Sequence, residues 1–336
     1  MQIDNRWEYS LETEALRVLH TAHQIAVGFY KVNNFIVLPY DPDYKDQSIV
    51  TFPDLAYYKI PRFWEKVRRV DIRNIPVKAP QDLVDDVEKL LAEVVLPEPH
   101  YKNIQKVWAM AQGEILAQIA KILPDKKGDI KSITIYPTLF GTNTSFNRPA
   151  KFPADAYLYL RHDQEIHAIV EAILTFLTRQ EFYDKLDGVW SESEAIVDWL
   201  VAFSSIAKVL GKYEKASGYM PTLSQIRYKQ RANLTQKSKE FYRKLGVNYQ
   251  VKDFKLENFS DLTAREKDLL ALMIKKGSSL TTVDEVAEIL FKENEDAFSL
   301  QAIAKQIQRL RDKLEANGVS GSFIQTKRGQ GYLLVN

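Results

Sequence analysis

The most constraining feature of this 336-residue sequence is an apolar stripe followed directly by a glycine-containing hairpin pattern. The stripe consists of Leu300, Ile303, Ile307, Leu310 and Leu314. Its steps of three and four residues place all five side chains on one face of a helix. Two short apolar segments in residues 323–336 then flank Gly329 and Gly331, which predicts a hairpin whose turn needs positive φ.

Two further helices are predicted upstream, and each begins with a capping box. Thr263 stands three residues before Glu266, and Thr282 stands three residues before Glu285. In each pair the side chains can satisfy free N–H groups of the first helical turn, which stabilises a helix by about 1 kcal/mol. The resulting order of helix, helix, longer helix and hairpin is typical of a winged helix-turn-helix.

Charge is unevenly placed in this C-terminal segment. Residues 251–298 hold seven cations and eleven anions, whereas residues 299–336 hold six cations and two anions. The segment is neutral as a whole, so the placement of its charge, and not its pI, favours docking onto phosphates.

The polar residues of the third helix are candidates for DNA recognition. Glutamine can read adenine edges, and arginine or lysine can read guanine or bind phosphate. We expect base-edge or nearby phosphate contacts from Gln301, Lys305, Gln308 and Arg309, and backbone contacts from Arg311, Lys327 and Arg328. An ordinary amphipathic helix with a solvated face is the alternative, and the hairpin that follows directly favours DNA binding.

Three sequence motifs carry a family resemblance. The segments LTAREKDLLALMIKKG, LQAIAKQIQRLRDKLEANG and IQTKRGQGYLL occur in this order. They resemble the winged-helix output domain of response-regulator transcription factors of the OmpR/PhoB type. The resemblance implies a recognition helix at 299–315 in the major groove and a wing at 323–335 on the backbone or minor groove. The family's N-terminal sheet has only VKDFKLENF as a source here, and its receiver pattern is absent, so phosphorelay control is not expected.

Composition and pattern predict a mixed α+β N-terminal domain ahead of the winged helix. We expect this domain at 1–218, a basic connector at 219–250 and the DNA-binding domain at 251–336. Within 224–247 seven cations face only Glu240, which indicates either a solvated helix face or a phosphate-attracting stretch. The absence of cysteine excludes disulfides and thiolate metal sites. Because no apolar stretch reaches 18 residues, we expect no membrane contact and a cytoplasmic protein.

Periodicity predicts the elements of the N-terminal part. Helices are expected at 11–27, 80–95, 101–123, 167–178 and 192–210. Strands are expected in FIVLPYD, in the β-rich segment SITIYPTLFGTNTSFN and in DAYLYLR.

One pair of these helices contains a possible metal motif. His167 and Glu171 lie four residues apart, and Glu194 follows on the next helix, which is the ligand spacing of gluzincin-type zinc sites. The surroundings resemble small minigluzincin-like zinc peptidases. Ala168 occupies the position of the catalytic glutamate, so hydrolysis is not expected. Three interpretations stay open: ordinary helix-surface residues, a decayed peptidase fold that binds a ligand, or a working metal site.

These observations predict a DNA-binding transcriptional regulator whose partner is double-stranded DNA and which needs no cofactor. Its N-terminal domain would act as a non-catalytic sensor or oligomerisation module that could bind a peptide or small molecule and form a homodimer. The alternative is a zinc-dependent gluzincin-like metallopeptidase with an appended winged helix.

Overall fold

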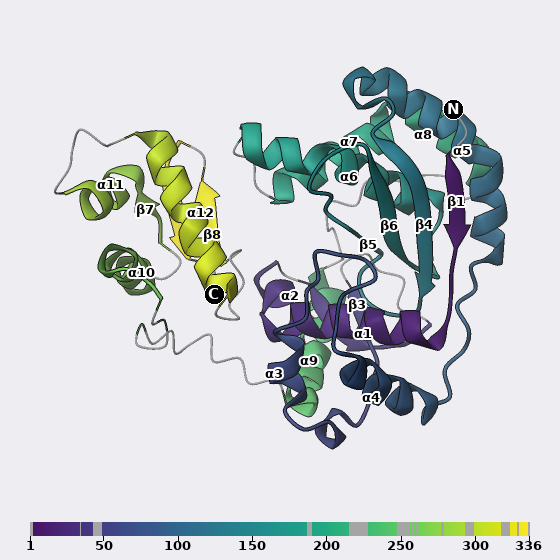
Figure 1. The fold of residues 1–336 in the computed structure, drawn as a ribbon, viewed down its shortest axis with the longest axis horizontal. Helices are drawn as coiled ribbons and strands as arrows, with labels where there is room; N and C mark the ends of the chain where they lie inside the picture. The colour runs from purple at the N-terminus through teal and green to yellow at the C-terminus, as the bar shows by residue number, and fades with distance from the viewer. Residues whose placement is uncertain are drawn as a thin grey trace. The chain divides into compact units, whose positions relative to one another are not determined.

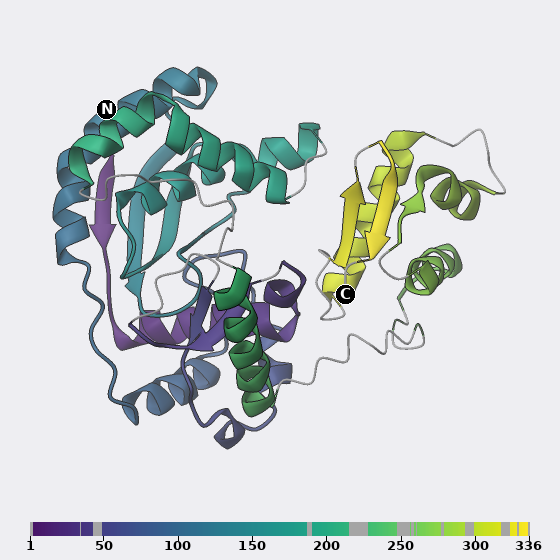
Figure 2. The same ribbon diagram turned by 180° about the vertical axis from the view of Figure 1, so that it is seen from behind.

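The computed structural model divides into two compact units, which are described separately. The first comprises residues 1–23 and 36–245, and the second comprises 24–35 and 246–336. Figures 1 and 2 show the elements of each from two sides. Within the described residues, no helix has the length and apolar character that crossing a membrane requires. The structure describes residues 3–33, 35–42, 49–186, 190–214, 228–246, 256, 259, 261–276, 279–292, 299–316, 323–327 and 329–334.

A four-stranded sheet forms the centre of the first unit (Figure 1). Its strands are β1 (Asp4–Trp7), β4 (Ile130–Thr138), β5 (Thr144–Phe146) and β6 (Ala154–Arg161). In the order β1-β4-β6-β5, the first three strands are parallel and β5 is antiparallel at the edge. Parallel neighbours need long crossover connections, and all the helices before β4 lie in the connection from β1 to β4. The mixed helix and strand content confirms the α+β prediction in this broad sense.

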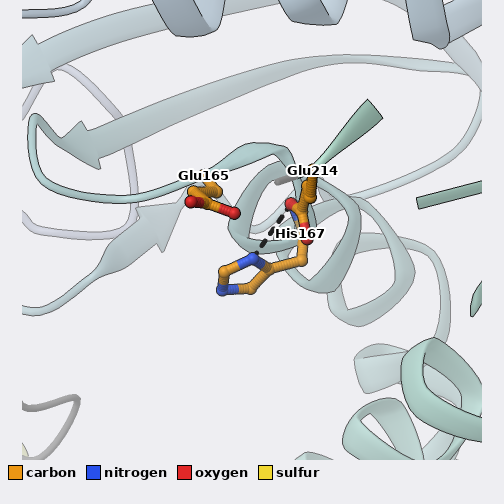
Figure 3. Close-up of side chains that lie close together, drawn as sticks. All are labelled: Glu165, His167 and Glu214. Atoms are coloured by element: carbon orange, nitrogen blue, oxygen red, sulfur yellow. Dashed lines mark hydrogen bonds and ion pairs between the residues drawn. The ribbon is translucent and has the colours of Figure 1, made fainter. Parts of the chain in front are cut away.

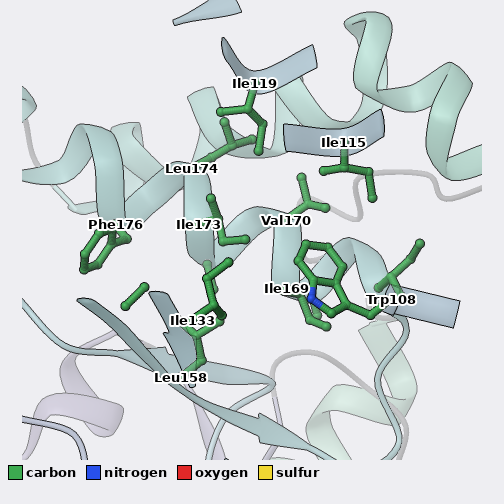
Figure 4. Packing of buried hydrophobic residues seen from close by; sticks show 14 of the residues in the cluster. Trp108, Ile115, Ile119, Ile133, Leu158, Ile169, Val170, Ile173, Leu174 and Phe176 are labelled. Atoms are coloured by element: carbon green, nitrogen blue, oxygen red, sulfur yellow. The ribbon is translucent and has the colours of Figure 1, made fainter. Parts of the chain in front are cut away.

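The main core lies between this sheet and two long helices. The helices before residue 246 are α1 (Leu11–Ala26), α2 (Phe29–Val32), α3 (Phe63–Val67), α4 (Gln81–Ala92), α5 (Lys102–Ile122), α6 (Ile166–Leu186), α7 (Trp190–Phe203), α8 (Ser205–Tyr213) and α9 (Tyr228–Leu245), with 3-10 turns η1 (Tyr57–Lys59) and η2 (Pro124–Lys126). Side chains from α5 and α6 meet those of β4 and β6 (Figure 4). Core residues that are at most 1% exposed include Trp108, Ile115, Ile169, Ile173, Ile133 and Leu158.

One predicted helix is divided in two. The sequence predicts a continuous helix at 192–210, but α7 ends at Phe203 and α8 begins at Ser205. Ser204 has extended backbone (φ −89°, ψ −174°), and its side chain accepts a hydrogen bond from the Ile206 N–H. Serine is a favoured N-cap because its hydroxyl satisfies a free donor of the new helix. This local capping outweighs the apolar periodicity that runs through both helices.

The basic segment packs onto a second small sheet of the first unit. This sheet consists of the parallel strands β2 (Ile36–Pro39) and β3 (Ile49–Phe52). The Val37 N–H donates to the Ser238 hydroxyl at 3.1 Å, and Leu234 packs against the apolar residues of β2 and β3. Phe241 and Leu245 are also buried. The predicted connector at 219–250 therefore contains a helix, α9, that is packed into the first unit.

The backbone at Gly141, within the β-rich segment SITIYPTLFGTNTSFN, accommodates a buried cation. Gly141 has a φ of 87°, and a side chain there would overlap the guanidinium of Arg17. That guanidinium is fully buried and donates to the carbonyl oxygens of Phe140 (2.9 Å) and Thr142 (3.2 Å). Only glycine combines the backbone angle with this close approach.

The second unit contains the predicted order of three helices and a hairpin. Its elements after residue 260 are α10 (Ala264–Lys276), β7 (Thr281–Thr282), α11 (Val283–Phe291), α12 (Leu300–Ala316), β8 (Ile324–Lys327) and β9 (Gly331–Leu334). The strands pair in the order β7-β9-β8. Both capping boxes are present: Thr263 and Glu266 exchange hydrogen bonds, as do Thr282 and Glu285. The apolar face of each helix packs, together with the hairpin, around one common core.

The stripe on α12 differs from its prediction at one end. Ile303, Ile307, Leu310 and Leu314 are at most 1% exposed, but Leu300 is 67% exposed. Leu300 is the first residue of the helix, so its side chain lies beyond the part of α12 that packs against the core. The predicted five-residue stripe is therefore a buried four-residue stripe. VKDFKLENF, the predicted source of additional strands, lies outside the described residues except for Leu256 and Phe259.

Candidate nucleic-acid interface

The exposed side of α12 carries the four residues predicted to read bases. The helix is opened by Ser299, whose hydroxyl accepts the Ala302 N–H at 3.0 Å. Its buried stripe faces the core, and the opposite side is exposed. The exposed polar residues of α12 include Gln301, Lys305, Gln308 and Arg309, together with Asp312.

These side chains offer donors, acceptors and positive charge along one helix face. Steps of four and three residues connect Gln301, Lys305 and Gln308, so the three side chains follow one line along the helix. The Gln308 amide donates to Asp312 at 2.9 Å, which holds the amide in a defined orientation. A glutamine amide and a cation on one helix are the groups that read purine edges in a major groove.

Arg311 has a role that the sequence did not predict. Its Nε donates to the Ile324 carbonyl at 3.1 Å, and its Nη2 donates to the Thr326 hydroxyl at 2.8 Å. Arg311 is half-buried, whereas Arg309 is exposed. These bonds join α12 to β8, so Arg311 fixes the hairpin against the helix. Its predicted contact with the DNA backbone stays a prediction.

A second cation fixes α12 to the start of α10. Lys313 Nζ donates to Glu266 Oε2 at 2.6 Å and to the Asp261 carbonyl at 3.1 Å. The same carboxylate oxygen accepts the Thr263 N–H at 2.7 Å as part of the capping box. Burial raises the pKa of Glu266, but the bonds from Lys313 and Thr263 outweigh it, so the net pKa is below the ordinary value. One buried carboxylate therefore caps α10 and positions α12.

The hairpin has the geometry that its glycines predict. β8 and β9 are antiparallel, with Lys327 opposite Gly331. Gly329 has a φ of 71° and Gly331 a φ of 145°, values that side-chain-bearing residues rarely adopt. Lys327 is exposed near the tip. Arg328, the other cation predicted to contact DNA, lies outside the described residues.

The first unit assembles a different polar cluster from the predicted metal triad. His167 Nδ1 lies 3.0 Å from Glu214 Oε1, and the same oxygen accepts the His167 backbone N–H at 2.6 Å (Figure 3). Glu165, His167 and Glu214 each offer a ligand atom within 4.8 Å of the others, and this is the one such group among the described residues. Glu214 follows α8 directly, so it joins the end of α8 to the beginning of α6.

The other two residues of the predicted triad lie outside this cluster. Glu194 forms an ion pair with Arg179, whose guanidinium lies 4.8 Å from the Phe146 ring centroid. Glu171 contributes charge near His167 but no ligand atom to the group. The zinc site of His167, Glu171 and Glu194 therefore stays a prediction, and no comparison supports the peptidase resemblance.

The electrostatics of His167 favour a bound proton. Burial lowers its pKa, but the hydrogen bond that the imidazole donates to Glu214 and the charges of Glu171, Glu214 and Glu165 raise the pKa by more, so the net pKa is above the ordinary value. A protonated imidazole beside these carboxylates forms a charge-assisted pair. Ala168, at the place of a catalytic glutamate, is fully buried.

Two of these functional contacts had no usable sequence signal. Glu214 stands 47 positions after His167, and no motif relates them. Lys313 stands 47 positions after Glu266, although the capping box did mark Glu266 as important. The bond between Arg311 and Thr326 depends on how the hairpin folds back, which spacing alone does not define.

Comparison with known proteins supports the C-terminal interpretation. Residues 257–334 match the family model described as "Transcriptional regulatory protein, C terminal". The match supports a winged helix-turn-helix and a DNA-binding, transcription-regulating role for this part of the chain. No curated protein and no solved structure matches the chain.

Proposed function

We propose that the chain is a sequence-specific regulator of transcription that binds double-stranded DNA through its second unit. In this proposal α12 lies in the major groove and the β8–β9 hairpin contacts the backbone or the minor groove. The observation that carries the proposal is the division of α12 into a buried apolar stripe and an exposed polar face next to the hairpin. The family match over 257–334 agrees with it.

Each exposed residue has a role that its chemistry supports. The amides of Gln301 and Gln308 are suited to adenine edges, and Lys305 and Arg309 are suited to guanine or to adjacent phosphates. Lys327 and Arg328 are proposed to contact phosphates from the hairpin. Phosphate contacts position the protein on the duplex, whereas base contacts determine the sequence that it reads.

The first unit acts in this proposal as a non-catalytic sensor or oligomerisation module. Its helix α6 carries Ala168 where a metallopeptidase carries its general base. His167 is paired with Glu214, and Glu194 is paired with Arg179. These pairs give the residues a structural use, which favours the sensor over the peptidase.

The test begins with selection of bound sequences from a random DNA pool by the full chain. Binding of the selected sequence is then measured for Lys305→Ala, Arg309→Ala and the matched control Lys275→Ala, which removes one exposed charge from α10. Loss of one base contact should cost about 1–3 kcal/mol, or about 5- to 150-fold in affinity, and relax specificity at one position. Lys327→Ala should weaken binding to all sequences alike and reduce the slope of log affinity against log salt concentration by about 0.9.

Two results would contradict the proposal. The first is a full chain that binds no duplex even at about 50 mM salt, where phosphate contacts are strongest. The second is an α12 variant that binds and discriminates as well as the Lys275→Ala control. Either result would show that α12 does not recognise the DNA sequence.

A further inference from the structure

We propose that the first unit carries a second DNA-contacting surface, which binds phosphates outside the bases read by α12. We call it the basic surface and define it by Lys66, Arg68 and Arg69 at α3 and by Lys237, Lys239 and Arg243 on α9. The inference rests on the proposed function, because it extends the DNA contact of the same chain. It gives a function to the cationic residues of α9, which the proposed DNA contacts of the winged helix do not involve.

The two segments of the basic surface are held together by direct contacts. Trp64 is the second residue of α3, and its indole N–H donates to the carbonyl oxygen of Leu245, the last residue of α9, at 2.9 Å. Lys244 also forms an ion pair with Asp54, which precedes η1. In both views α3 and α9 lie side by side (Figures 1 and 2). The cations of the two helices therefore belong to one region of the first unit.

Packing orients the cations of α9 toward solvent. Ser238, Phe241 and Leu245 are at most 7% exposed and form the side of the helix that contacts the unit. Lys237, Lys239 and Arg243 are exposed. Because the buried side is anchored by the bond from Val37 to Ser238, the exposed side has a fixed direction. Lys239 and Arg243, four residues apart, share one line along this exposed side. Preorganised cations lose less entropy on binding a polyanion than those of a flexible tail do.

The basic surface contains more positive charge than its own carboxylates balance. Neighbouring cations are paired, as in Arg62 with Glu65, Lys59 with Glu93 and Lys244 with Asp54. Among the residues that the structure describes, the six cations of the basic surface form no salt bridge. Glu65 and Glu240 are the carboxylates of α3 and α9, so these two helices carry an excess of positive charge. Like charges on neighbouring segments repel one another, and an anionic partner would offset that repulsion.

A surface pocket beside α3 is large enough for a phosphate group. Its volume is about 310 Å³, and its lining includes Arg62, Lys66 and Arg69 with Pro80 and Asp82 at the start of α4. These three cations line the pocket together with the carboxylates of Glu65 and Asp82. The net charge of the lining is positive, which favours an anion over a cation.

Helix stabilisation accounts for only part of the basic surface. Cations near a helix C-terminus interact favourably with the helix dipole, which accounts for Arg243. It also accounts for Arg68, the C-cap of α3, but not for Lys237 and Lys239, which are exposed in the interior of α9. A DNA backbone fits both segments because it presents regularly spaced phosphates to a row of cations. The DNA-binding role supported for the same chain favours a duplex over other polyanions.

The experiment compares two full-chain variants that lose the same charge. The first is Arg68→Ala, Arg69→Ala, Lys239→Ala and Arg243→Ala in combination. The control removes four exposed lysines elsewhere in the first unit: Lys106→Ala, Lys121→Ala, Lys131→Ala and Lys151→Ala. Affinity is measured against salt for the selected sequence in a minimal duplex and in a duplex of about 60 base pairs.

The proposal predicts that wild type and control bind the long duplex with a steeper salt dependence than the minimal duplex. The basic-surface variant should lose this difference, because each lost phosphate contact reduces the slope by about 0.9. With three or four contacts, its salt slope on the long duplex should be lower than the control's by about 3. Far-UV circular dichroism and tryptophan fluorescence verify that both variants fold.

The outcomes separate this proposal from the proposed function. If wild type selects a sequence but both four-residue variants give the same slopes, the basic surface is refuted and α12 keeps its role. If no sequence is selected but the basic-surface variant alone loses duplex binding, the second surface stands and the proposed function fails. Loss of binding to anionic lipid vesicles or to single-stranded RNA, without loss on the duplex, assigns the surface to another partner and overturns the proposal.

Discussion

Substituting Gly331 tests how strictly the hairpin backbone determines the second unit. Gly331 has a φ of 145°, and a Cβ there would overlap the Thr281 carbonyl and lie 2.8 Å from Thr282 Cα. The atoms that the Cβ would overlap belong to the backbone of β7, so they cannot move aside by a rotamer change as a side chain can. In Gly331→Ala, β7 and β9 must therefore separate at the pair Thr282 and Gly331.

The expected cost has two parts. The backbone angle costs about 1–3 kcal/mol for a residue with a side chain. Loss of one or two hydrogen bonds between β7 and β9 costs about 0.5–1.5 kcal/mol each. The total is about 1.5–6 kcal/mol, with a middle value near 4 kcal/mol. Gly329→Ala is the matched control, because Gly329 also has positive φ (71°) but nothing within 4 Å of the added Cβ, so only about 1–2 kcal/mol is expected.

Hydrogen exchange measured by mass spectrometry resolves this difference. All five tryptophans precede residue 200, so intrinsic tryptophan fluorescence reports on the first unit and does not follow the hairpin. Peptides covering 323–334 should lose protection about tenfold in Gly329→Ala and about several hundredfold in Gly331→Ala at the middle of its range, since 1.4 kcal/mol corresponds to tenfold. Peptides from α5 should remain unchanged. Equal protection in the two variants would show that the contact with Thr281 and Thr282 does not constrain the hairpin.

Two pH dependences follow from the ion pairs of the two units. Because the folded pKa of Glu266 is lowered, its bond with Lys313 stabilises the fold above the unfolded pKa, and this stability is lost as pH falls through the folded value. Glu266→Gln should therefore be about 2 kcal/mol less stable than wild type at pH 6. Hydrogen exchange of α10 and α12, corrected for the intrinsic rate at each pH, measures this, and the stabilities of variant and wild type should converge below pH 4. A difference that stays constant with pH would contradict the role of the Glu266–Lys313 pair. The folded pKa of His167 is raised, so its contribution is complete below about pH 6.5 and is lost as pH rises through the folded value. Wild type should lose more stability than Glu214→Gln between pH 6 and pH 9 in urea unfolding followed by tryptophan fluorescence, and parallel pH profiles would show that the pair contributes nothing.

The sequence predicted those features that depend on local spacing. The steps between Ile303 and Leu314 identified the buried side of α12, and the pairs Thr263 with Glu266 and Thr282 with Glu285 identified two helix starts. Such signals are local because helix periodicity and first-turn capping involve residues within four positions of one another. The hairpin was predictable for the same reason, since its glycines mark the backbone angles directly.

Features that depend on long-range packing were not predictable in this way. Nothing in the sequence relates His167 to Glu214, and the spacing of His167, Glu171 and Glu194 suggested a triad that the described structure does not gather. The cationic residues of α9 could be recognised in the sequence, but their proximity to the cations of α3 could not. Only the fold brings α3 and α9 together, through the bond between Trp64 and Leu245. At Ser204 a single side-chain cap divided a helix that the apolar pattern predicted as continuous.

The contacts of Arg311 and Lys313 separate two tasks along one helix. These residues attach α12 to the hairpin and to α10, and the buried stripe attaches it to the core. Within the part of the chain that the structure describes, the exposed Gln301, Lys305 and Arg309 form none of the bonds that attach the helix. Their side chains are thus free to vary under selection without altering how the helix is held. A family of proteins with this scaffold could diversify its target sequences quickly, and an engineer could exchange those positions as a set to redirect binding.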